Sequence, residues 1–302
     1  MRSDGPERHA LLPDPASRTS PDSGTAINSP PGYPIDQSAP NAARIYDWLL
    51  GGEESYPADR QAARRLLRAV PGARQAARDN RAYLGRVTRW LAGQGISQFI
   101  DIGSGLPAAH PVHEVARQVH PDARVAYVDH DDVAVARARA ILAGTPGLAA
   151  VHADLRSPRD LLTRPDLRRA VDLTRPVAVL LIAVAHFLAD DDSPGEVIQA
   201  ITHRIAPGSY IAISHVTADD ITPGAQKTAR AAYDGASVPV QPRSRQDVAR
   251  LLAGLDLVPP GITDIRAWHR PGRQGTLAPP VLFWGGAARV PGPARPSPAG
   301  TC

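Results

Sequence analysis

The stretch QFIDIGSG (98–105) decides the fold that the sequence predicts. An apolar run typical of a buried strand leads directly into Gly103 and Gly105, and a helical segment begins near Val112. Glycine lets the backbone turn tightly and approach a ligand closely, and open α/β sheets bind ligands at the carboxyl ends of their strands. The sequence therefore predicts a nucleotide-binding loop between a strand and a helix.

After this loop, short apolar runs alternate with helical segments. The predicted strands are QFIDI (98–102), RVAYVD (124–129), AAVH (149–152), VAVLLIA (177–183) and YIAIS (210–214). The predicted helices between and after them are 112–119, 133–143, 194–205 and 244–253. Near-continuous apolar strands that alternate with helices indicate a parallel sheet covered on both faces. Two later segments, ITDIRAW (262–268) and VLFWGGAAR (281–289), are candidates for an antiparallel edge.

The two ends of the chain differ from this middle part. Residues 41–91 are helical in character: ARIYDWLL (43–50) is amphipathic, and Pro57 stands where the first turn of a second helix tolerates proline. Residues 1–38 and 290–302 are rich in proline and show no apolar periodicity. Such segments bury too little surface to offset the entropy of ordering, so we expect both to be disordered tails.

Composition excludes several classes of protein. The 302 residues carry 34 basic and 30 acidic side chains, and no long run of like charges indicates a nucleic-acid surface. Cys302 is the single cysteine, which excludes internal disulfides and cysteine-based zinc sites. The sequence lacks a secretory signal and an apolar run long enough to span a membrane. We expect a soluble, cytoplasmic protein that binds neither nucleic acid nor membrane.

Two cofactors are compatible with the glycine loop. Residues 103–108 match the dinucleotide pattern G-x-G-x-x-A, whereas an acidic residue followed by G-x-G is typical of an S-adenosylmethionine site. The carboxylate of Asp101 would repel a pyrophosphate but can pair with an amino-acid ammonium, and Pro107 lacks an N–H to offer a phosphate. Asp154, after the third strand, offers an acceptor to an adenine amino group. These features favour S-adenosylmethionine.

Asp129 ends the second predicted strand and serves either cofactor. A carboxylate at this position can accept hydrogen bonds from both ribose hydroxyls. The alternative is that Asp129 caps the helix 133–143. Because Asp131 and Asp132 already suit that cap, we favour the ribose role.

The order of motifs resembles an actinobacterial family of S-adenosylmethionine-dependent methyltransferases that was first catalogued as a domain of unknown function. The matching stretches include NAARIYDWLLGGEESYPADRQAA (41–63), ARQAARDNRAYLGRVTRWLAGQGISQFIDIGSGLP (73–107), VHEVARQVHPDARVAYVDHD (112–131), LAGTPGLAAVHADLRSP (142–158), RPVAVLLIAVAHFLADDD (175–192), IAPGSYIAISHVT (205–217) and WGGAAR (284–289). The resemblance implies a class I methyltransferase fold with a seven-stranded, mostly parallel sheet and helices on both faces. It also implies a helical cap (39–92) that closes over a cofactor-binding domain (93–289).

The resemblance also implies roles for individual residues. Asp101, Gly103 and Gly105 would hold the methionine end, Asp129 the ribose, and Asp154 with Leu155 the adenine. Ser104, His130, Arg44 and Tyr46 complete the candidate cofactor-binding set, the last two from the segment that resembles the cap signature. His130 stands where the family usually has asparagine.

Histidines are the remaining catalytic candidates. His186 follows the fourth predicted strand, where it could act as a general base on the acceptor. The alternative, which we favour, is a histidine that only fixes its loop by a local hydrogen bond. His215 is a weaker candidate for the same role. His110 and His113 have the spacing of a metal pair, but no third ligand is evident, so we expect no metal.

Three functions follow from this interpretation. The first is methyl transfer from S-adenosylmethionine to an unidentified small molecule. The second is a protein that binds S-adenosylmethionine without catalysis, as a sensor or assembly partner. The third, a nicotinamide-dependent dehydrogenase, is disfavoured by Asp101 and Pro107. The sequence predicts neither the acceptor nor the oligomeric state.

Overall fold

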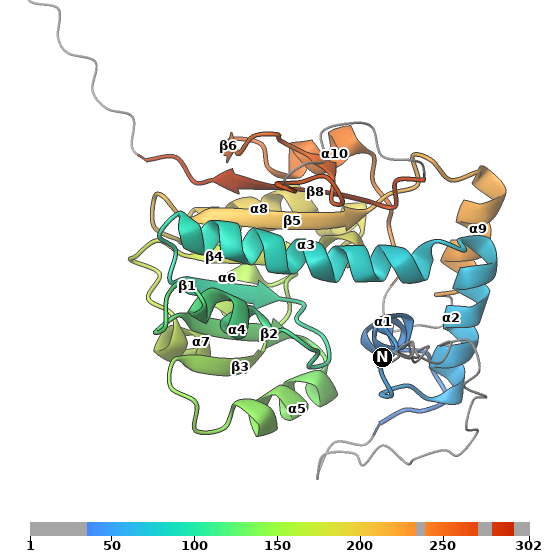
Figure 1. Cartoon of the computed structure of the whole chain (residues 1–302), viewed down its shortest axis with the longest axis horizontal. Helices are drawn as coiled ribbons and strands as arrows, with labels where there is room; N and C mark the ends of the chain where they lie inside the picture. The colour runs from blue at the N-terminus through green and yellow to red at the C-terminus, as the bar shows by residue number, and fades with distance from the viewer. Residues whose placement is uncertain (1–34, 234–238, 271–279, 293–302) are drawn as a thin grey trace, which may run out of the picture.

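A computed structural model describes residues 35–233, 239–270 and 280–292 (Figure 1). Its strands are β1 (Gln98–Ile102), β2 (Arg124–Asp129), β3 (Leu148–His152), β4 (Ala178–Ile182), β5 (Tyr210–Val216), β6 (Asp256–Leu257), β7 (Thr263–Asp264) and β8 (Phe283–Arg289). Its α-helices are α1 (Ala42–Leu50), α2 (Pro57–Ala69), α3 (Ala73–Gly93), α4 (Val112–Arg117), α5 (Asp132–Leu142), α6 (Pro158–Thr163), α7 (Pro165–Ala170), α8 (Pro194–Thr202), α9 (Pro223–Ala231) and α10 (Arg245–Leu251). Two 3₁₀ turns are η2 (Ala185–Phe187) and η3 (Asp190–Asp192). The expected tails lie largely outside the described residues.

The predicted mostly parallel sheet is confirmed. In the described chain, β3, β2, β1, β4 and β5 lie side by side in parallel, and β8 pairs antiparallel with β5. The expected antiparallel edge is therefore present. It contains two two-residue strands, β6 and β7, which both pair with β8, so eight strands form the sheet instead of seven. Pro259 and Pro260 lie between them and offer no N–H to a continuous ladder.

Alternate residues of each strand face opposite layers of helices. On β4, Leu180 packs with one apolar cluster and Val179 and Leu181 with the other. The first cluster is formed with α3 and α4, and the second with α6, α7, α8 and α10. The sheet is thus covered on both faces, which is why its central strands β1 and β4 are buried along their whole length. Strand β4 is wholly apolar, whereas β1 carries Gln98 and Asp101.

The N-terminal helices lie at the end of the sheet where the parallel strands finish, on the right in Figure 1. Asn41 caps α1 by accepting hydrogen bonds from the backbone N–H groups of Ala43 and Arg44, and Gly51 ends the helix with φ +95°. Helices α1 and α2 pack around Ile45 and small alanines of α2. The predicted amphipathic stretch 43–50 and the predicted helix start at Pro57 therefore agree with the observed α1 and α2.

Helix α3 connects the N-terminal helices to the sheet. Ala77 packs with α1 and α2, whereas Tyr83 and Val87 pack on the sheet. The Tyr83 hydroxyl lies 2.9 Å from the carbonyl oxygen of Gly286 and 3.1 Å from that of Ile213. One continuous helix therefore fixes the position of the N-terminal helices over the strand ends.

The sequence did not predict α6, α7 or α9. Helix α9 has the sequence PGAQKTARA, whose only apolar side chains beyond proline are alanines, so it carries no clear apolar stripe. It nevertheless packs against α2. Among the described helices, none combines the length and hydropathy required to cross a membrane.

Candidate functional site

A cavity of about 230 Å³ lies between the carboxyl ends of the parallel strands and helices α1, α2, α3 and α9. Its walls include the loops that follow β1, β2, β4 and β5. Its polar lining residues are Asn41, Asp47, Asn80, Arg81, Asp101, Ser104, Asp129, His130, Asp131, His186, Thr217, Gln226 and Arg230. Gly103, Gly105 and Tyr46 also line it, so most of the sequence-predicted site residues meet here.

The glycine loop requires glycine at its first position. Gly103 has φ +72°, and a Cβ there would collide with the side chain of Val184. Its backbone N–H donates to the carbonyl oxygen of Val128 at 2.8 Å, which ties the loop to β2. Gly105 also has a positive φ, +65°. The loop is thereby bent around the ends of β1 and β2, with its backbone exposed to the cavity.

Asp129 holds the other side of this loop. Its Oδ2 accepts a hydrogen bond from the Gly105 N–H at 2.8 Å, and its Oδ1 accepts one from the Asp131 N–H at 2.9 Å. Burial alone would raise the pKa of Asp129. Hydrogen bonds from the side chain of His130 and from these backbone groups outweigh burial and hold the pKa below its ordinary value. Asp129 is therefore a buried carboxylate that is ionised at neutral pH.

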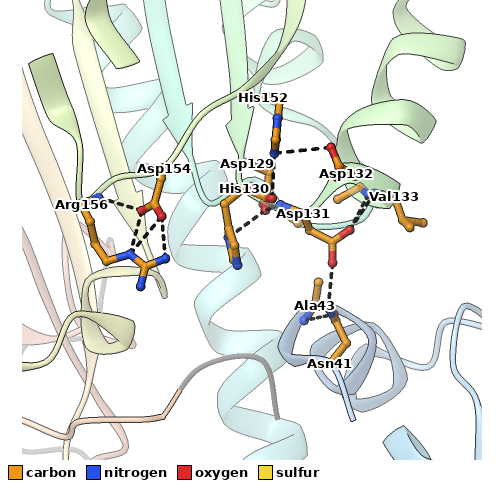
Figure 2. Close-up of polar contacts among 12 residues, drawn as sticks. Asn41, Ala43, Asp129, His130, Asp131, Asp132, Val133, His152, Asp154 and Arg156 are labelled. Atoms are coloured by element: carbon orange, nitrogen blue, oxygen red, sulfur yellow. Dashed lines mark hydrogen bonds and ion pairs between the residues drawn. The ribbon is translucent and has the colours of Figure 1, made fainter. Parts of the chain in front are cut away.

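Asp131, and not Asp129, caps α5. Its Oδ1 accepts from the N–H groups of Val133 and Ala134 at 2.8 and 3.0 Å. Its Oδ2 accepts a hydrogen bond from Asn41 Nδ2 at 2.7 Å, so the N-terminal caps of α1 and α5 are joined directly (Figure 2). The alternative role considered for Asp129, the N-cap of this helix, is thus taken by Asp131.

Of the four carboxylates in the described cavity lining, Asp101 is the least compensated. Its side chain is 6% exposed, and no described residue donates a hydrogen bond to its carboxylate. Burial raises the pKa of Asp101 to about 7, against a lowering effect of Arg81 and together with a raising effect of Asp129. A buried carboxylate without a partner is destabilising unless a cation meets it. This position fits a ligand that carries an ammonium group.

Two predicted adenine residues lie outside the cavity lining. The carboxylate of Asp154 accepts hydrogen bonds from the Arg156 guanidinium at 2.5 to 3.1 Å, which holds its pKa below the ordinary value. Leu155 is buried in the core cluster beneath the sheet. Figure 2 shows His130 between Asp154 and Asp129, so the residue that extends the cavity toward Asp154 is His130.

Arg44 is engaged within the N-terminal helices. Its Nε donates to the fully buried carboxylate of Asp59 at 2.7 Å, and the guanidinium lies over the Tyr56 ring. Asp59 also accepts from the Asn41 N–H at 2.8 Å. Arg44 is not part of the cavity lining, and its contacts hold α1 against α2.

Tyr46 lines the cavity with its hydroxyl already paired. The hydroxyl donates to the carbonyl oxygen of Ala77 at 3.1 Å and accepts from Asn80 Nδ2 at 2.9 Å. Asn80 Oδ1 accepts from Ser214 Oγ at 2.5 Å, and Ser214 Oγ accepts from the Ala183 N–H at 2.9 Å. This buried chain joins α1, α3, β5 and the end of β4. Sequence analysis missed Asn80. Its position as a polar residue on the apolar face of α3 could have identified it as a candidate site residue.

His186 lies in the cavity wall on η2 and is neutral. Burial, His215 and Arg243 lower its pKa well below the ordinary value. Its Nδ1 accepts from the Val216 N–H at 3.5 Å, which leaves the ring proton on Nε2. In this tautomer Nε2 is a potential hydrogen-bond donor, and Nδ1 is already occupied as an acceptor. The general-base role requires the opposite tautomer.

His215 is a buried structural partner and lies outside the cavity lining. Its Nδ1 donates to the Val216 carbonyl oxygen at 2.8 Å, and its Nε2 accepts from Arg243 at 3.2 Å. Arg243 also donates to the Leu188 carbonyl at 3.0 Å and to Asp190 at 2.6 Å. Arg243, which sequence analysis missed, therefore holds the loop that carries His186. No local pattern around it signals this role.

Comparisons with known proteins agree with this geometry. A family model described as S-adenosyl methyltransferase matches residues 29–291. A solved structure of a candidate methyltransferase from Thermobifida fusca is 38% identical, with a TM-score of 0.79 over 85% of this chain and 97% of that one. A DUF574 family protein from Streptomyces avermitilis is 35% identical, with a TM-score of 0.79 over 85% of this chain and 100% of that one. No curated protein matches. The chain thus belongs to the S-adenosyl methyltransferase family, and its cofactor is S-adenosylmethionine.

Proposed function

We propose that the protein transfers the methyl group of S-adenosylmethionine to a small organic acceptor bound in the cavity beneath α1 and α2. One observation supports this proposal most strongly. Asp101, beside the glycine loop, is a buried carboxylate to which no described residue donates a hydrogen bond. When bound, the cofactor supplies a methyl group on a positively charged sulfur, which leaves as a neutral thioether after transfer. The protein needs to align donor and acceptor and to exclude water.

In this proposal Asp101 pairs with the cofactor's ammonium group, and the backbone of Gly103, Ser104 and Gly105 lines the methionine end. Asp129 receives the ribose hydroxyls with the acceptor capacity that the hydrogen bonds from Gly105, Asp131 and His130 leave unused. His130 flanks the adenine.

For Asp154 and Leu155 we keep the adenine role as a proposal. A carboxylate offers about four acceptor positions, so Asp154 can accept from an adenine amino group while it stays paired with Arg156.

His186 is the proposed catalytic residue. His186 lines the cavity, and in the tautomer set by the Val216 N–H its neutral ring carries the proton on Nε2. We propose that this group orients the acceptor by donating a hydrogen bond to its heteroatom. Alignment of this kind is a recognised source of rate enhancement. Residues 39–92 act as the cap, with Arg44 and Tyr46 stabilising its position through Asp59 and Asn80.

Cofactor affinity is expected to rise with pH up to neutrality. Burial raises the pKa of Asp101 to about 7, so below that pH the carboxyl is neutral and cannot pair with an ammonium. Affinity should fall by up to about 10-fold per pH unit below 7. The same group makes the ligand-free protein less stable as the pH rises toward 7, because its pKa is higher in the folded state than in the unfolded state. Calorimetric titration with S-adenosylhomocysteine at pH 5.5, 6.5 and 7.5 measures the slope, and a flat profile would refute the pairing.

The cap is expected to become protected when the cofactor binds. Asn41 and Glu54 join it to α5 through contacts with Asp131 and Arg137 of 2.7 and 2.6 Å. A ligand beneath it adds contacts that must break before the cap opens. At 100 times its dissociation constant, S-adenosylhomocysteine should slow cleavage after Glu53 and Glu54 by a glutamate-specific protease roughly 10-fold or more. Cleavage after Glu196 on α8 is the control. Equal rates of cleavage in the cap with and without ligand would refute the proposal that the cap closes over the cofactor.

The activity is tested with a pool of small metabolites. The full chain, S-adenosylmethionine and the pool are incubated, and S-adenosylhomocysteine is quantified together with any product heavier by one methylene group. Release of S-adenosylhomocysteine that depends on a component of the pool supports the transferase. Tight binding of the cofactor without any product across chemically diverse pools would favour the non-catalytic alternative. The cytoplasmic location and the absence of nucleic-acid partners stay predictions.

A further inference from the structure

Half of the cavity is not used by the proposed cofactor contacts. The cavity-lining groups assigned to the cofactor follow β1 and β2, whereas the cavity continues over β4, β5 and β8 to α2 and α9. Since β4 lies between β1 and β5 in the sheet, His186, which follows β4, stands at the junction of the two halves. If the proposed function holds, the acceptor has to occupy this second half.

The second half is lined mainly by apolar side chains. They come from elements that are distant in sequence, and they include Leu66, Val70, Phe187, Val216, Leu282 and Phe283. Three of the rings around the junction lie close to one another. The His186 centroid is 4.4 Å from that of Phe187 and 6.2 Å from that of Phe283. Aromatic side chains that line the same wall can contact a further aromatic ring edge-to-face or offset-stacked, so this wall favours an aromatic ligand.

Charge in the described lining is distributed unevenly between the halves. The lining carboxylates Asp47, Asp101, Asp129 and Asp131 belong to α1 and to the β1 and β2 ends. The described lining over β4, β5 and β8 contributes no carboxylate, and the guanidinium of Arg230, which lines the cavity from α9, is exposed. A cationic acceptor would lose its hydration there without gaining a counter-charge.

From this lining we propose that the methyl acceptor is an aromatic small molecule without a positive charge, whose ring lies against Phe187 and Phe283 and whose apolar body contacts Leu66. The proposal rests on the proposed function, because it identifies the second half of the cavity as the acceptor site. It names the substrate class and leaves the methylated atom open.

The test measures acceptor binding and cofactor binding separately. The full chain is first titrated with S-adenosylhomocysteine. The saturated complex is then titrated with 1-naphthol and, as a saturated control with the same carbon skeleton, decahydro-1-naphthol. Ring contacts worth about 0.5–1.5 kcal/mol predict that naphthol binds roughly 2- to 12-fold more tightly than its saturated analogue. A polar probe, myo-inositol, should show no binding.

Two half-buried leucines on α2 provide a matched pair of variants. Leu66 and Leu67 both pack against the α1–α2 cluster, but of the two only Leu66 lines the cavity. Leu66→Gln should weaken naphthol binding about 10-fold or more, and Leu67→Gln by less than about twofold, since a buried apolar contact is worth 1–3 kcal/mol. Both should bind S-adenosylhomocysteine like the wild type. Phe283→Leu should abolish the preference for naphthol over decahydro-1-naphthol.

The possible results separate the two proposals. Absence of S-adenosylhomocysteine binding would overturn the proposed function. Normal S-adenosylhomocysteine binding with no naphthol binding, with equal binding of naphthol and its saturated analogue, or with equal effects of Leu66→Gln and Leu67→Gln would overturn only the acceptor class. Preference for myo-inositol would overturn it as well.

Discussion

Asp101→Asn is expected to weaken the binding of S-adenosylhomocysteine roughly 100- to 4,000-fold and to leave the ligand-free protein at least as stable as the wild type. Removing one member of a buried ion pair costs about 3–5 kcal/mol, and here the partner is the ligand. Without ligand, the carboxylate of Asp101 is buried and receives no hydrogen bond from a described residue. Replacing it with a neutral amide of the same size therefore removes an unfavourable charge.

This pairing of weaker binding with unchanged or higher stability distinguishes a ligand-binding carboxylate from a structural one. Calorimetry gives the affinity, and a melting curve of the ligand-free variant at pH 8 gives the stability. Asp160→Asn, an exposed change on α6 outside the cavity lining, is the control and should alter neither quantity. Affinity within threefold of the wild type, or a lower melting temperature with normal affinity, would show that Asp101 does not bind the ammonium.

Asp129→Ala is expected to reduce both affinity and stability. The lost hydrogen bonds to ribose, each about 1.5–3 kcal/mol for a charged acceptor, predict a roughly 10- to 1,000-fold weaker complex. In the ligand-free protein, Asp129 also accepts from the N–H groups of Gly105 and Asp131, both of which would lose a partner. An unfolding free energy lower by about 1–3 kcal/mol follows.

The asparagine variant refines this result. Asp129→Asn keeps one acceptor oxygen, but its NH₂ group would face a backbone N–H, so we expect values between those of the wild type and of Asp129→Ala. Affinity is measured by calorimetry at a temperature where each variant is folded. A folded Asp129→Ala with affinity within threefold of the parent protein would refute the ribose assignment.

The core of the fold was predictable because its signals are local. Strand β1 and the loop through Gly105 follow from a short apolar run and two glycines, and Asn41 and Gly51 mark the ends of α1 as capping residues. The divided edge of the sheet was less predictable. Pro259 and Pro260 were visible in the sequence, but the two-residue strands on either side of them gain their pairing only from β8.

The electrostatics of the site could not be predicted, because they depend on long-range partners. Nothing near Arg44 indicates that its charge is matched by Asp59 within the cap, which moves it out of the cavity lining. Arg243 contacts Leu188 and His215 from far along the chain. Likewise, the sequence placed a carboxylate at residue 101, but only the packed structure reveals that its neighbours leave it without a donor.

The most direct test of the account is a calorimetric titration of the unmodified chain, at pH 7.5, with S-adenosylhomocysteine and, in a separate experiment, with NAD. We expect a single site for S-adenosylhomocysteine and no measurable binding of NAD, because Asp101 repels a pyrophosphate and pairs with an ammonium. Binding of NAD, or no binding of S-adenosylhomocysteine, would contradict it.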